Sequence, residues 1–317
     1  MNSYMIDDSY FENKYVVFLM RTLSKIVWFI KYRSVDNPIN NELARELIDS
    51  VSKISHLNNT TDFDSLNQWN DIANNIRDNM IKHGVINFLQ WECIRETMGE
   101  ENSLFLYDEF KYVKKSPLWK TYRHKITYPN VGNPLPFLGD IELTGATVHH
   151  LYCLFKFIEN THIDISTLDN IYEFGGGYGN MCRLLYLFGF KGKYHIFDFQ
   201  VMSAVQKYYL SNHGIENVNL VYKEEYWESL LKNTPKDERN LLIATWSLSE
   251  SPLSVRKKTR MNMKLFDNFL IGYQKKFGEV DNEAYFNDIK SELDNINWLE
   301  FEMTKLPKHY LLVGSKK

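Results

Sequence analysis

Short strand-like segments alternate with helical patterns along the second half of this chain of 317 residues. The strand-like segments read NIYEF, KYHIFDF, VNLVY, NLLIATW and NFLIGY, and the final pair reads WLEFEM and HYLLVG. Hydrophobic periodicity predicts a helix after each of the first four strand-like segments, at residues 180–188, 201–213, 225–231 and 255–266. Such alternation is typical of βαβ units, in which helices connect the parallel strands of one sheet. We therefore predict an α/β fold for this half.

A cluster of glycines follows the first of these strands. The sequence EFGGGYGN places four glycines within five positions, directly before a helical pattern. A glycine-rich turn at this point lies at the carboxyl edge of the strands, where open α/β sheets bind ligands. The dinucleotide pattern GxGxxG does not fit, since its third glycine, counted from Gly175, falls on Asn180. The pattern that fits is ExGxGxG, formed by Glu173, Gly175, Gly177 and Gly179.

Two acidic residues frame this loop. Glu173 precedes the first glycine, where its charge repels a pyrophosphate but suits a ligand with an ammonium group and a sulfonium. Asp198 ends the second strand, nineteen residues beyond Gly179. A carboxylate at that place can accept hydrogen bonds from both hydroxyls of a ribose, although it can also cap the helix that follows. The residues thus predict a nucleotide-like cofactor.

These motifs resemble those of the class I S-adenosylmethionine (SAM)-dependent methyltransferases, whose first motif is the ExGxGxG loop and whose second strand ends in a ribose-binding acid. The last two strand-like segments are similar to that fold's closing antiparallel hairpin. More narrowly, YEFGGGYGNM, WSLSE and GEVDNEAYF resemble the sugar O-methyltransferases encoded among bacterial surface-polysaccharide genes. The chain departs from that family at Ser251, where a methionine is frequent, which puts the acceptor pocket in doubt.

The resemblance implies a fold, a cofactor and an acceptor. The fold is a Rossmann-like, mostly parallel sheet, and the cofactor is SAM. The acceptor is a hydroxyl of a sugar or of a nucleotide-linked sugar, in capsule or lipopolysaccharide biosynthesis. Alternatives are a methyltransferase that acts on another small molecule, a catalytically silent methyltransferase-like subunit, and a nicotinamide oxidoreductase. The last is disfavoured because the third glycine is missing.

Further cofactor-binding residues follow from the same resemblance. Glu224, after the third strand, lies where this fold contacts adenine, unless it is only a solvated acid at a helix start. Phe199, next to the ribose-binding acid, and Trp246, after the fourth strand, are also expected in the cofactor site.

Candidates for a general base lie near the fourth strand and before the first. Glu250 is expected to face the transferable methyl, unless it merely favours the dipole of a helix that Ser249 or Ser251 caps. His149 and His150, early in the helix that leads into the sheet, are the alternative bases. The sequence has no acidic cluster that argues for a divalent metal, so we expect none.

The first half has a different pattern. Segments such as NNELARELIDSVSKI predict helices, and the prolines and glycines of residues 126–141 preclude long regular elements there. We predict a helical N-terminal domain at 1–144, whose Pro-rich loop closes over the site, and a SAM-binding domain at 145–317.

Composition limits partners and location. A formal net charge of −3 and a pI near 6.3 give no basic footprint, so we expect no nucleic-acid partner. Three scattered cysteines fit a reducing, cytoplasmic compartment. The apolar segment 15–32 is interrupted by Arg21 and Lys25, so it is not expected to span a membrane. We expect a helix in the core or in a homo-oligomer interface, and a helix on a membrane surface is the alternative.

Overall fold

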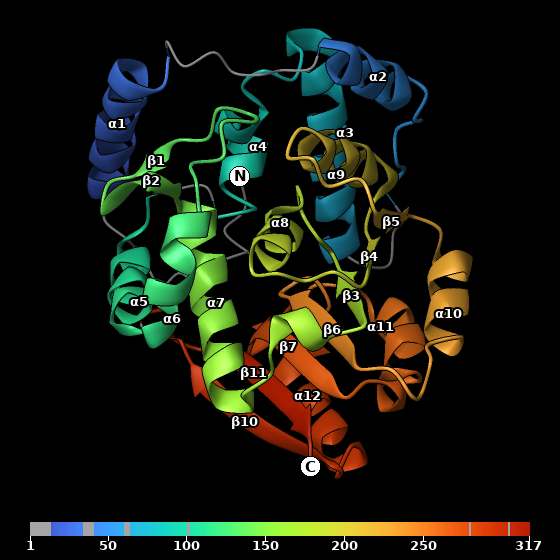
Figure 1. Ribbon diagram of the computed structural model, residues 1–317. Helices are drawn as coiled ribbons and strands as arrows, with labels where there is room; N and C mark the ends of the chain where they lie inside the picture. Colours follow the sequence, from blue (N-terminus) through green and yellow to red (C-terminus); the bar gives the residue numbers. More distant parts are fainter. Residues whose placement is uncertain (1–13, 34–40, 60–63, 100–101, 279, 304) are drawn as a thin grey trace.

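A computed structural model describes residues 14–33, 41–59, 64–99, 102–278, 280–303 and 305–317 (Figure 1). Its centre is a seven-stranded sheet with the order β10-β11-β7-β6-β3-β4-β5. The strands are β3 (Asn170–Phe174), β4 (Lys193–Phe197), β5 (Val218–Val221), β6 (Asn240–Thr245), β7 (Asn268–Gln274), β10 (Ile296–Glu302) and β11 (His309–Lys316).

The pairing of these strands defines the fold class. β3 pairs in parallel with β4 and β6, β4 with β5, and β6 with β7, whereas β11 is antiparallel to both β7 and β10. The chain therefore runs outward from β3 to one side and then returns to build the other, which is a doubly wound sheet with its switch point between β3 and β6. This confirms the predicted Rossmann-like methyltransferase sheet with a closing antiparallel hairpin.

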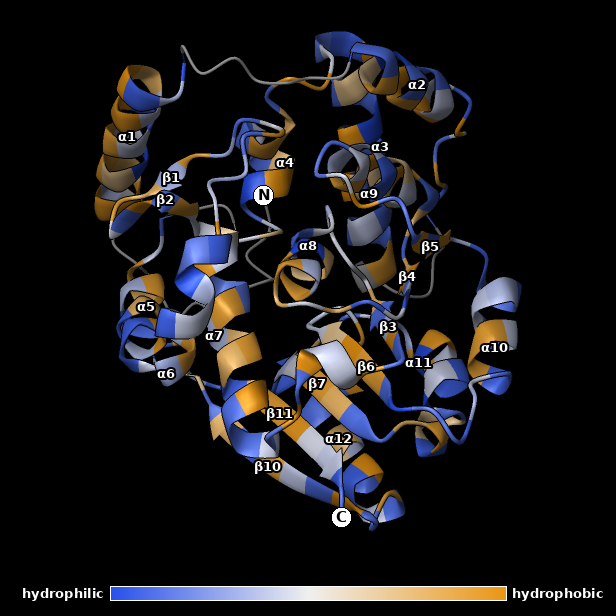
Figure 2. Cartoon of the chain, viewed as in Figure 1, coloured by the Kyte–Doolittle hydropathy of each residue, from blue (hydrophilic) through white to orange (hydrophobic). Residues whose placement is uncertain are grey.

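Helices cover both faces of the sheet. They are α7 (Gly145–Thr161), α8 (Asn180–Leu187), α9 (Gln200–Ser211), α10 (Glu224–Lys232), α11 (Leu253–Arg260) and α12 (Asn282–Glu292). One buried cluster joins α7, α8 and α9 to the sheet, and a second joins α10 and α12 to its other face. Every residue of β3 and β7 is buried, as expected for strands that helices cover on both sides. Figure 2 shows the hydrophobic colouring of β6 and β7.

The observed helices differ from the predicted ones in two places. The helix predicted at 255–266 ends at Arg260, and a separate 3-10 turn at Met263–Leu265 follows it. At Asn262, between the two, the backbone N–H donates to the carbonyl of Thr259, and the side-chain amide donates to the carbonyl of Lys258. The α-helical hydrogen-bond pattern therefore ends before Asn262. The helix α12 was not predicted, because its apolar positions are too few to give a clear period.

The described first half consists of helices and a small hairpin. The helices are α1 (Lys14–Lys31), α2 (Asn41–Ser52), α3 (Asp64–His83), α4 (Glu92–Arg95), α5 (Leu104–Lys115) and α6 (Pro117–Tyr122), with 3-10 turns at Phe88–Gln90 and Arg123–Lys125. The hairpin is β1 (Pro136–Phe137) with β2 (Asp140–Thr144). The second half adds a 3-10 turn at Ile165–Thr167 and a hairpin of β8 (Lys276–Phe277) with β9 (Val280–Asp281). In the described part of the chain, no helix has the length and apolar character needed to cross a bilayer.

Packing brings this half against the site edge of the sheet. α2 and α3 pack on α9, and α5 packs on α7. Side chains from helices far away in the sequence thus reach the loops that follow β3 and β6.

Candidate functional site

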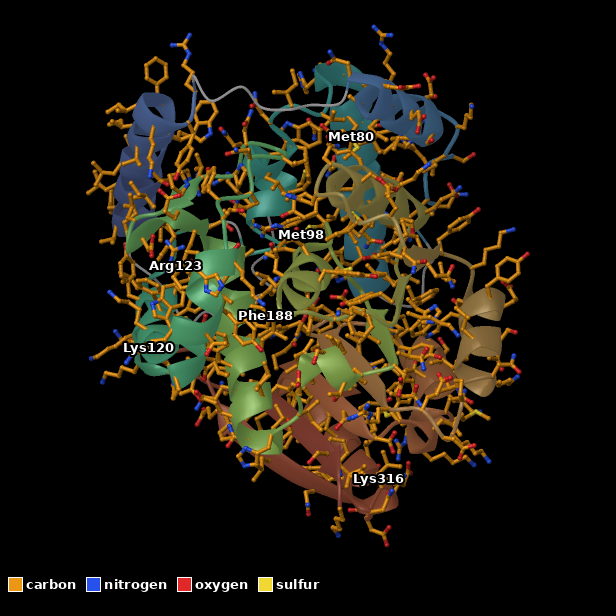
Figure 3. All side chains as sticks on the ribbon, in the orientation of Figure 1. Met80, Met98, Lys120, Arg123, Phe188 and Lys316 are labelled. Carbon is orange, nitrogen blue, oxygen red and sulfur yellow. The ribbon has the colours of Figure 1, made fainter. Side chains whose placement is uncertain are left out.

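The glycine loop after β3 adopts a backbone that only glycine takes readily. Gly175, Gly177 and Gly179 have φ values of 74°, 54° and 102°. At Gly175 a Cβ atom would lie 2.2 Å from Cβ of Ser247, so the loop packs directly on the segment after β6. At Gly177 a Cβ atom would meet nothing closer than Sδ of Met98, at 3.6 Å. Figure 3 places Met98 between α4 and α8, so a residue of the first half borders the open side of the loop.

Asp198 connects the ends of β3 and β4. Its Oδ2 accepts hydrogen bonds from the N–H of Gly177 at 3.1 Å and from the Gln206 side chain at 2.9 Å. Its Oδ1 accepts from the N–H of Phe199 at 2.8 Å. Burial raises the pKa of Asp198 to about 7, and these donors act against that rise. Gln206 also donates to the carbonyl of Gly177 at 2.8 Å, so a residue that the sequence did not single out fixes the loop.

Glu173 lies beneath the glycine loop. Its side chain is 2% exposed, and its Oε2 accepts a hydrogen bond from the hydroxyl of Tyr194 at 2.8 Å. Burial raises the pKa of Glu173 to about 8, the Tyr194 bond lowers it, and the charge of Asp198 adds to the rise. Its hydrogen-bonding partner is therefore within the sheet.

Trp246 stands at the carboxyl end of β6 in a left-handed backbone conformation, with φ of 65°. Its N–H donates to the carbonyl of Gly272 at 2.8 Å, and its ring covers Gly272, where a Cβ atom would come within 2.9 Å. Its indole N–H donates to Nδ1 of His309 at 3.0 Å. The ring of His149 lies 4.9 Å from the Trp246 ring, centroid to centroid. The structure thus brings two of the predicted residues, His149 and Trp246, together.

His149 forms a buried pair with Glu109 of α5. The distance from Nδ1 to Oε2 is 2.9 Å, and the two side chains are 12% and 2% exposed. Burial disfavours the charged imidazole, but the Glu109 carboxylate and the Cys153 side chain together raise the pKa of His149 well above its ordinary value. Sequence reasoning missed Glu109, because nothing in α5 marks one acid of an amphipathic helix as buried.

His150 points elsewhere, as adjacent residues on a helix do. Its Nδ1 lies 3.0 Å from Nδ2 of Asn180, at the start of α8. Burial lowers the pKa of His150 to about 3, and the charge of His149 acts in the same direction. His150 is therefore neutral at physiological pH.

Glu250 lies between the two halves of the protein. Its Oε1 is 3.4 Å from the Gln274 amide, and the Trp69 indole of α3 donates a hydrogen bond to its carboxylate. Burial raises the pKa of Glu250 to about 7, although both donors lower it. The alternative that a neighbouring serine caps the next helix does not hold. The residue before α11 is Pro252, and it has no side-chain cap.

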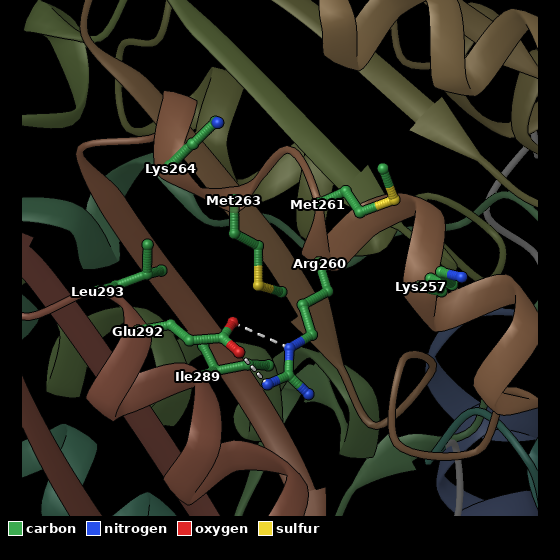
Figure 4. Close-up of a pocket in the computed structure, with 8 residues that line it drawn as sticks. All are labelled: Lys257, Arg260, Met261, Met263, Lys264, Ile289, Glu292 and Leu293. Carbon is green, nitrogen blue, oxygen red and sulfur yellow. Dashed lines mark hydrogen bonds and ion pairs between the residues drawn. The ribbon is translucent and has the colours of Figure 1, made fainter.

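Glu224 and a surface hollow lie apart from the residues described above. Glu224 begins α10, and its exposed carboxylate pairs with Lys258 at 2.5 Å. A hollow of about 460 Å³ opens between α11 and α12, where Arg260 pairs with Glu292 (Figure 4). None of the hollow's lining residues belongs to the glycine loop or to the segments that carry Asp198 and Trp246.

Comparisons with known proteins concern the fold. No model of a known protein family matches the sequence, and no curated protein does. Among solved structures, the N-terminal domain of human METTL16 in complex with SAH has a TM-score of 0.40 and 12% identity, over 55% of this chain and 72% of that chain. An rRNA methylase from Streptococcus thermophilus has a TM-score of 0.39 and 14% identity, over 50% and 96%. The mitomycin 7-O-methyltransferase MmcR has a TM-score of 0.37 and 7% identity, over 68% and 69%.

The fold assignment rests on the strand order rather than on these distant likenesses. The order and direction of the strands are those of a class I methyltransferase sheet. The chain thus has the fold of the class I methyltransferases.

The exclusion of nucleic acid as a partner is wrong. The matching structures include rRNA methylases, among them the 16S rRNA methylase ArmA, so the exclusion is withdrawn. The physical reason is that a net charge averages over the whole surface. In this chain Lys257, Lys258, Arg260 and Lys264 lie on α11 and the turn after it, within a total charge of −3, although Lys258 pairs with Glu224 and Arg260 with Glu292. The sugar acceptor has no counterpart among the structures described above.

Proposed function

We propose that this chain is a methyltransferase that uses SAM and methylates a hydroxyl group, with a sugar as the acceptor class that the sequence indicates. The observation that supports it most is the arrangement of Asp198 and the glycine loop at the switch point of the sheet. Ligands of open α/β sheets bind at that point.

The residues of this edge fit SAM. Gly177 leaves open the side of the loop that a cofactor needs, and Asp198 is only partly buried. Oδ1 of Asp198 accepts a hydrogen bond from the N–H of Phe199, and a carboxylate oxygen can accept a second one from a ribose hydroxyl. The predicted binding residues at this edge are Glu173, Gly175, Gly177, Gly179, Asp198, Phe199 and Trp246. Glu224, which was also predicted, begins α10 and pairs with Lys258 outside this cluster. SAM, when bound, supplies a methyl group that its sulfonium makes electrophilic.

The protein contributes alignment and a proton acceptor. A sugar hydroxyl is a poor nucleophile when neutral, and a general base with a pKa near the working pH removes its proton most effectively. Glu250, with a pKa of about 7, meets this condition, and one of its carboxylate oxygens would accept the proton. In His149 the Nδ1 atom faces Glu109 and Nε2 lies 3.9 Å from Sγ of Cys153. The raised pKa keeps the imidazole protonated, so His149 is the weaker candidate for a proton acceptor. Met98 lies beside Gly177 and Trp69 beside Glu250, so side chains of the first half border this edge and would restrict the access of water to a bound substrate.

Calorimetric titration with SAM and with NADH tests the cofactor. Binding of SAM and not of NADH is expected, and the reverse result would overturn the proposal. Methyl transfer from labelled SAM is then measured with nucleotide sugars, with oligosaccharides and with RNA. Transfer to a sugar alone supports the proposed acceptor, transfer to RNA alone rejects it, and SAM binding without any turnover identifies a silent subunit.

A further inference from the structure

The outer face of α1 is apolar along its whole length. Seven large side chains on this one helix are between 50% and 80% exposed: Tyr15, Phe18, Leu19, Leu23, Ile26, Phe29 and Ile30. We call them the α1 stripe. They recur three or four positions apart, so they form one continuous band on a helix. Figure 1 shows α1 at the periphery of the molecule, and Figure 2 shows its hydrophobic colouring.

The opposite face of α1 attaches it to the protein. Ser24 donates a hydrogen bond to the carbonyl of Pro136, and the Tyr32 hydroxyl donates to the carbonyl of Ile141 at 2.7 Å. The Tyr32 ring stacks on Tyr128 with centroids 3.8 Å apart. The helix is therefore held through its inner face, and the stripe points outward. A surface helix that needs no other partner is polar on that side.

The charged residues of α1 itself have one sign. The helix contains Lys14, Arg21, Lys25 and Lys31 and no acidic residue, although Lys31 at its end pairs with Glu142 of β2. Lys25 is exposed, and it lies next to Ile26, which belongs to the stripe. Arg33, just after the helix, is exposed, and its guanidinium lies 4.4 Å from the centre of the Phe29 ring. The surface thus combines aromatic and aliphatic side chains with cations. A complementary partner has both an apolar region and negatively charged groups.

A second copy of the chain fits this surface poorly. In an antiparallel pair of helices, a two-fold axis places each flank of one helix against the same flank of the other. Lys25 would then meet the partner's cationic flank, and α1 has no acid that could neutralise it. Like charges in such a seam oppose pairing.

We propose that α1 binds the surface of an anionic phospholipid membrane. Helices that lie in a membrane interface carry aromatic and aliphatic residues on one side and Lys or Arg beside them. Anionic headgroups attract such cations, and the acyl region accepts the apolar side chains. The helix lies along the surface and does not cross it, in agreement with the absence of a spanning helix among the described residues.

Co-sedimentation of the full chain with vesicles tests this proposal. Vesicles of phosphatidylglycerol and phosphatidylethanolamine should retain the protein, and added salt should weaken the binding, whereas vesicles of phosphatidylcholine alone should bind it less. The triple variant Phe18→Ser, Ile26→Gln, Ile30→Gln should lower the partition coefficient at least about 100-fold, because three apolar side chains no longer enter the lipid. Lys25→Gln should reduce both the binding and its salt dependence.

Two control variants separate α1 from other surfaces. Tyr226→Ser removes an apolar side chain of α10 that is 63% exposed, and it should leave binding unchanged. Lys257→Gln with Lys264→Gln removes cations beside the α11 hollow, and it should also leave binding unchanged. Circular dichroism verifies that each variant is folded.

Three outcomes would overturn the proposal. The first is a full chain that binds no anionic vesicle. The second is binding that the triple variant retains, or that the α11 variant loses. The third is a dimer in sedimentation velocity that the triple variant converts to a monomer while vesicles bind neither, which would assign the stripe to a second copy of the chain.

Discussion

The carboxylate of Glu109 lies 2.9 Å from Nδ1 of His149, and both side chains are largely withdrawn from solvent. The pair joins α5 to α7 directly beside Trp246, so it links the helical half to the candidate site. Removal of one member of a buried charged pair leaves the other without a counter-charge.

Glu109→Ala is expected to destabilise the protein by roughly 3–5 kcal/mol, because His149 stays buried without its partner. Chemical denaturation measures this loss. The conservative variant Glu109→Gln should lower the pKa of His149, followed by NMR of the imidazole. An unchanged pKa in Glu109→Gln would show that the carboxylate is not what holds the proton on His149.

The pH dependence of stability should reflect Glu173. Because its pKa is raised to about 8, the folded chain binds a proton there that the unfolded chain loses near its ordinary value of 4.5. The free energy of unfolding should therefore fall as the pH rises from about 5 to 8, by up to about 1.4 kcal/mol per pH unit from this one group. Glu173→Gln, which can still accept from Tyr194, should flatten that slope in urea titrations at pH 5.5 and 8. A variant as steep as the wild type would assign the slope to other groups.

Asp198→Ala is expected to weaken SAM binding by roughly 10- to 150-fold, since a charge-assisted hydrogen bond contributes about 1.5–3 kcal/mol. Asp198 also anchors the glycine loop, so Gln206→Leu serves as the matched control. It removes one hydrogen bond to the Gly177 carbonyl and one to Asp198 but leaves the carboxylate in place. Calorimetry should show a smaller loss for Gln206→Leu than for Asp198→Ala. Equal losses would mean that Asp198 acts only through the loop.

The sequence predicted the parts of the site that depend on local pattern. The alternation of strands and helices and the spacing of Gly175, Gly177 and Gly179 determine where the loop and Asp198 lie, because each follows directly from a strand end. Met98, Trp69 and Glu109 could not be found in this way. They come from α3, from the turn after α4 and from α5 in the first half, and only tertiary packing brings them to the site.

Side-chain direction was equally beyond the sequence. Adjacent residues on one helix point in different directions, so His149 contacts Glu109 while His150 contacts Asn180. The sequence does not identify the partner of either histidine. Likewise Trp246 takes a left-handed backbone conformation that only the carbonyl of Gly272 and the contact with its ring explain. Neither feature has a local sequence signal.

The identity of the general base is the most demanding prediction. Glu250 is the leading candidate, because its pKa of about 7 leaves a proton acceptor available near neutral pH. Glu250→Gln keeps a side chain of the same shape that can accept from the Trp69 indole, so SAM affinity should stay near wild type. Turnover should fall by roughly the 10²- to 10⁴-fold that general-base catalysis contributes.

Matched substitutions decide between the candidates. His149→Gln and His150→Gln should each retain most of the turnover if Glu250 is the base, and only Glu250→Gln should lose the acidic limb of the pH profile, near pH 7. The limb arises because a protonated Glu250 cannot accept the hydroxyl proton, and glutamine does not titrate. A His149→Gln enzyme that alone loses both turnover and this limb would transfer the role to the pair with Glu109. If all three variants keep their turnover, alignment of the acceptor oxygen with the methyl carbon accounts for the rate without a base.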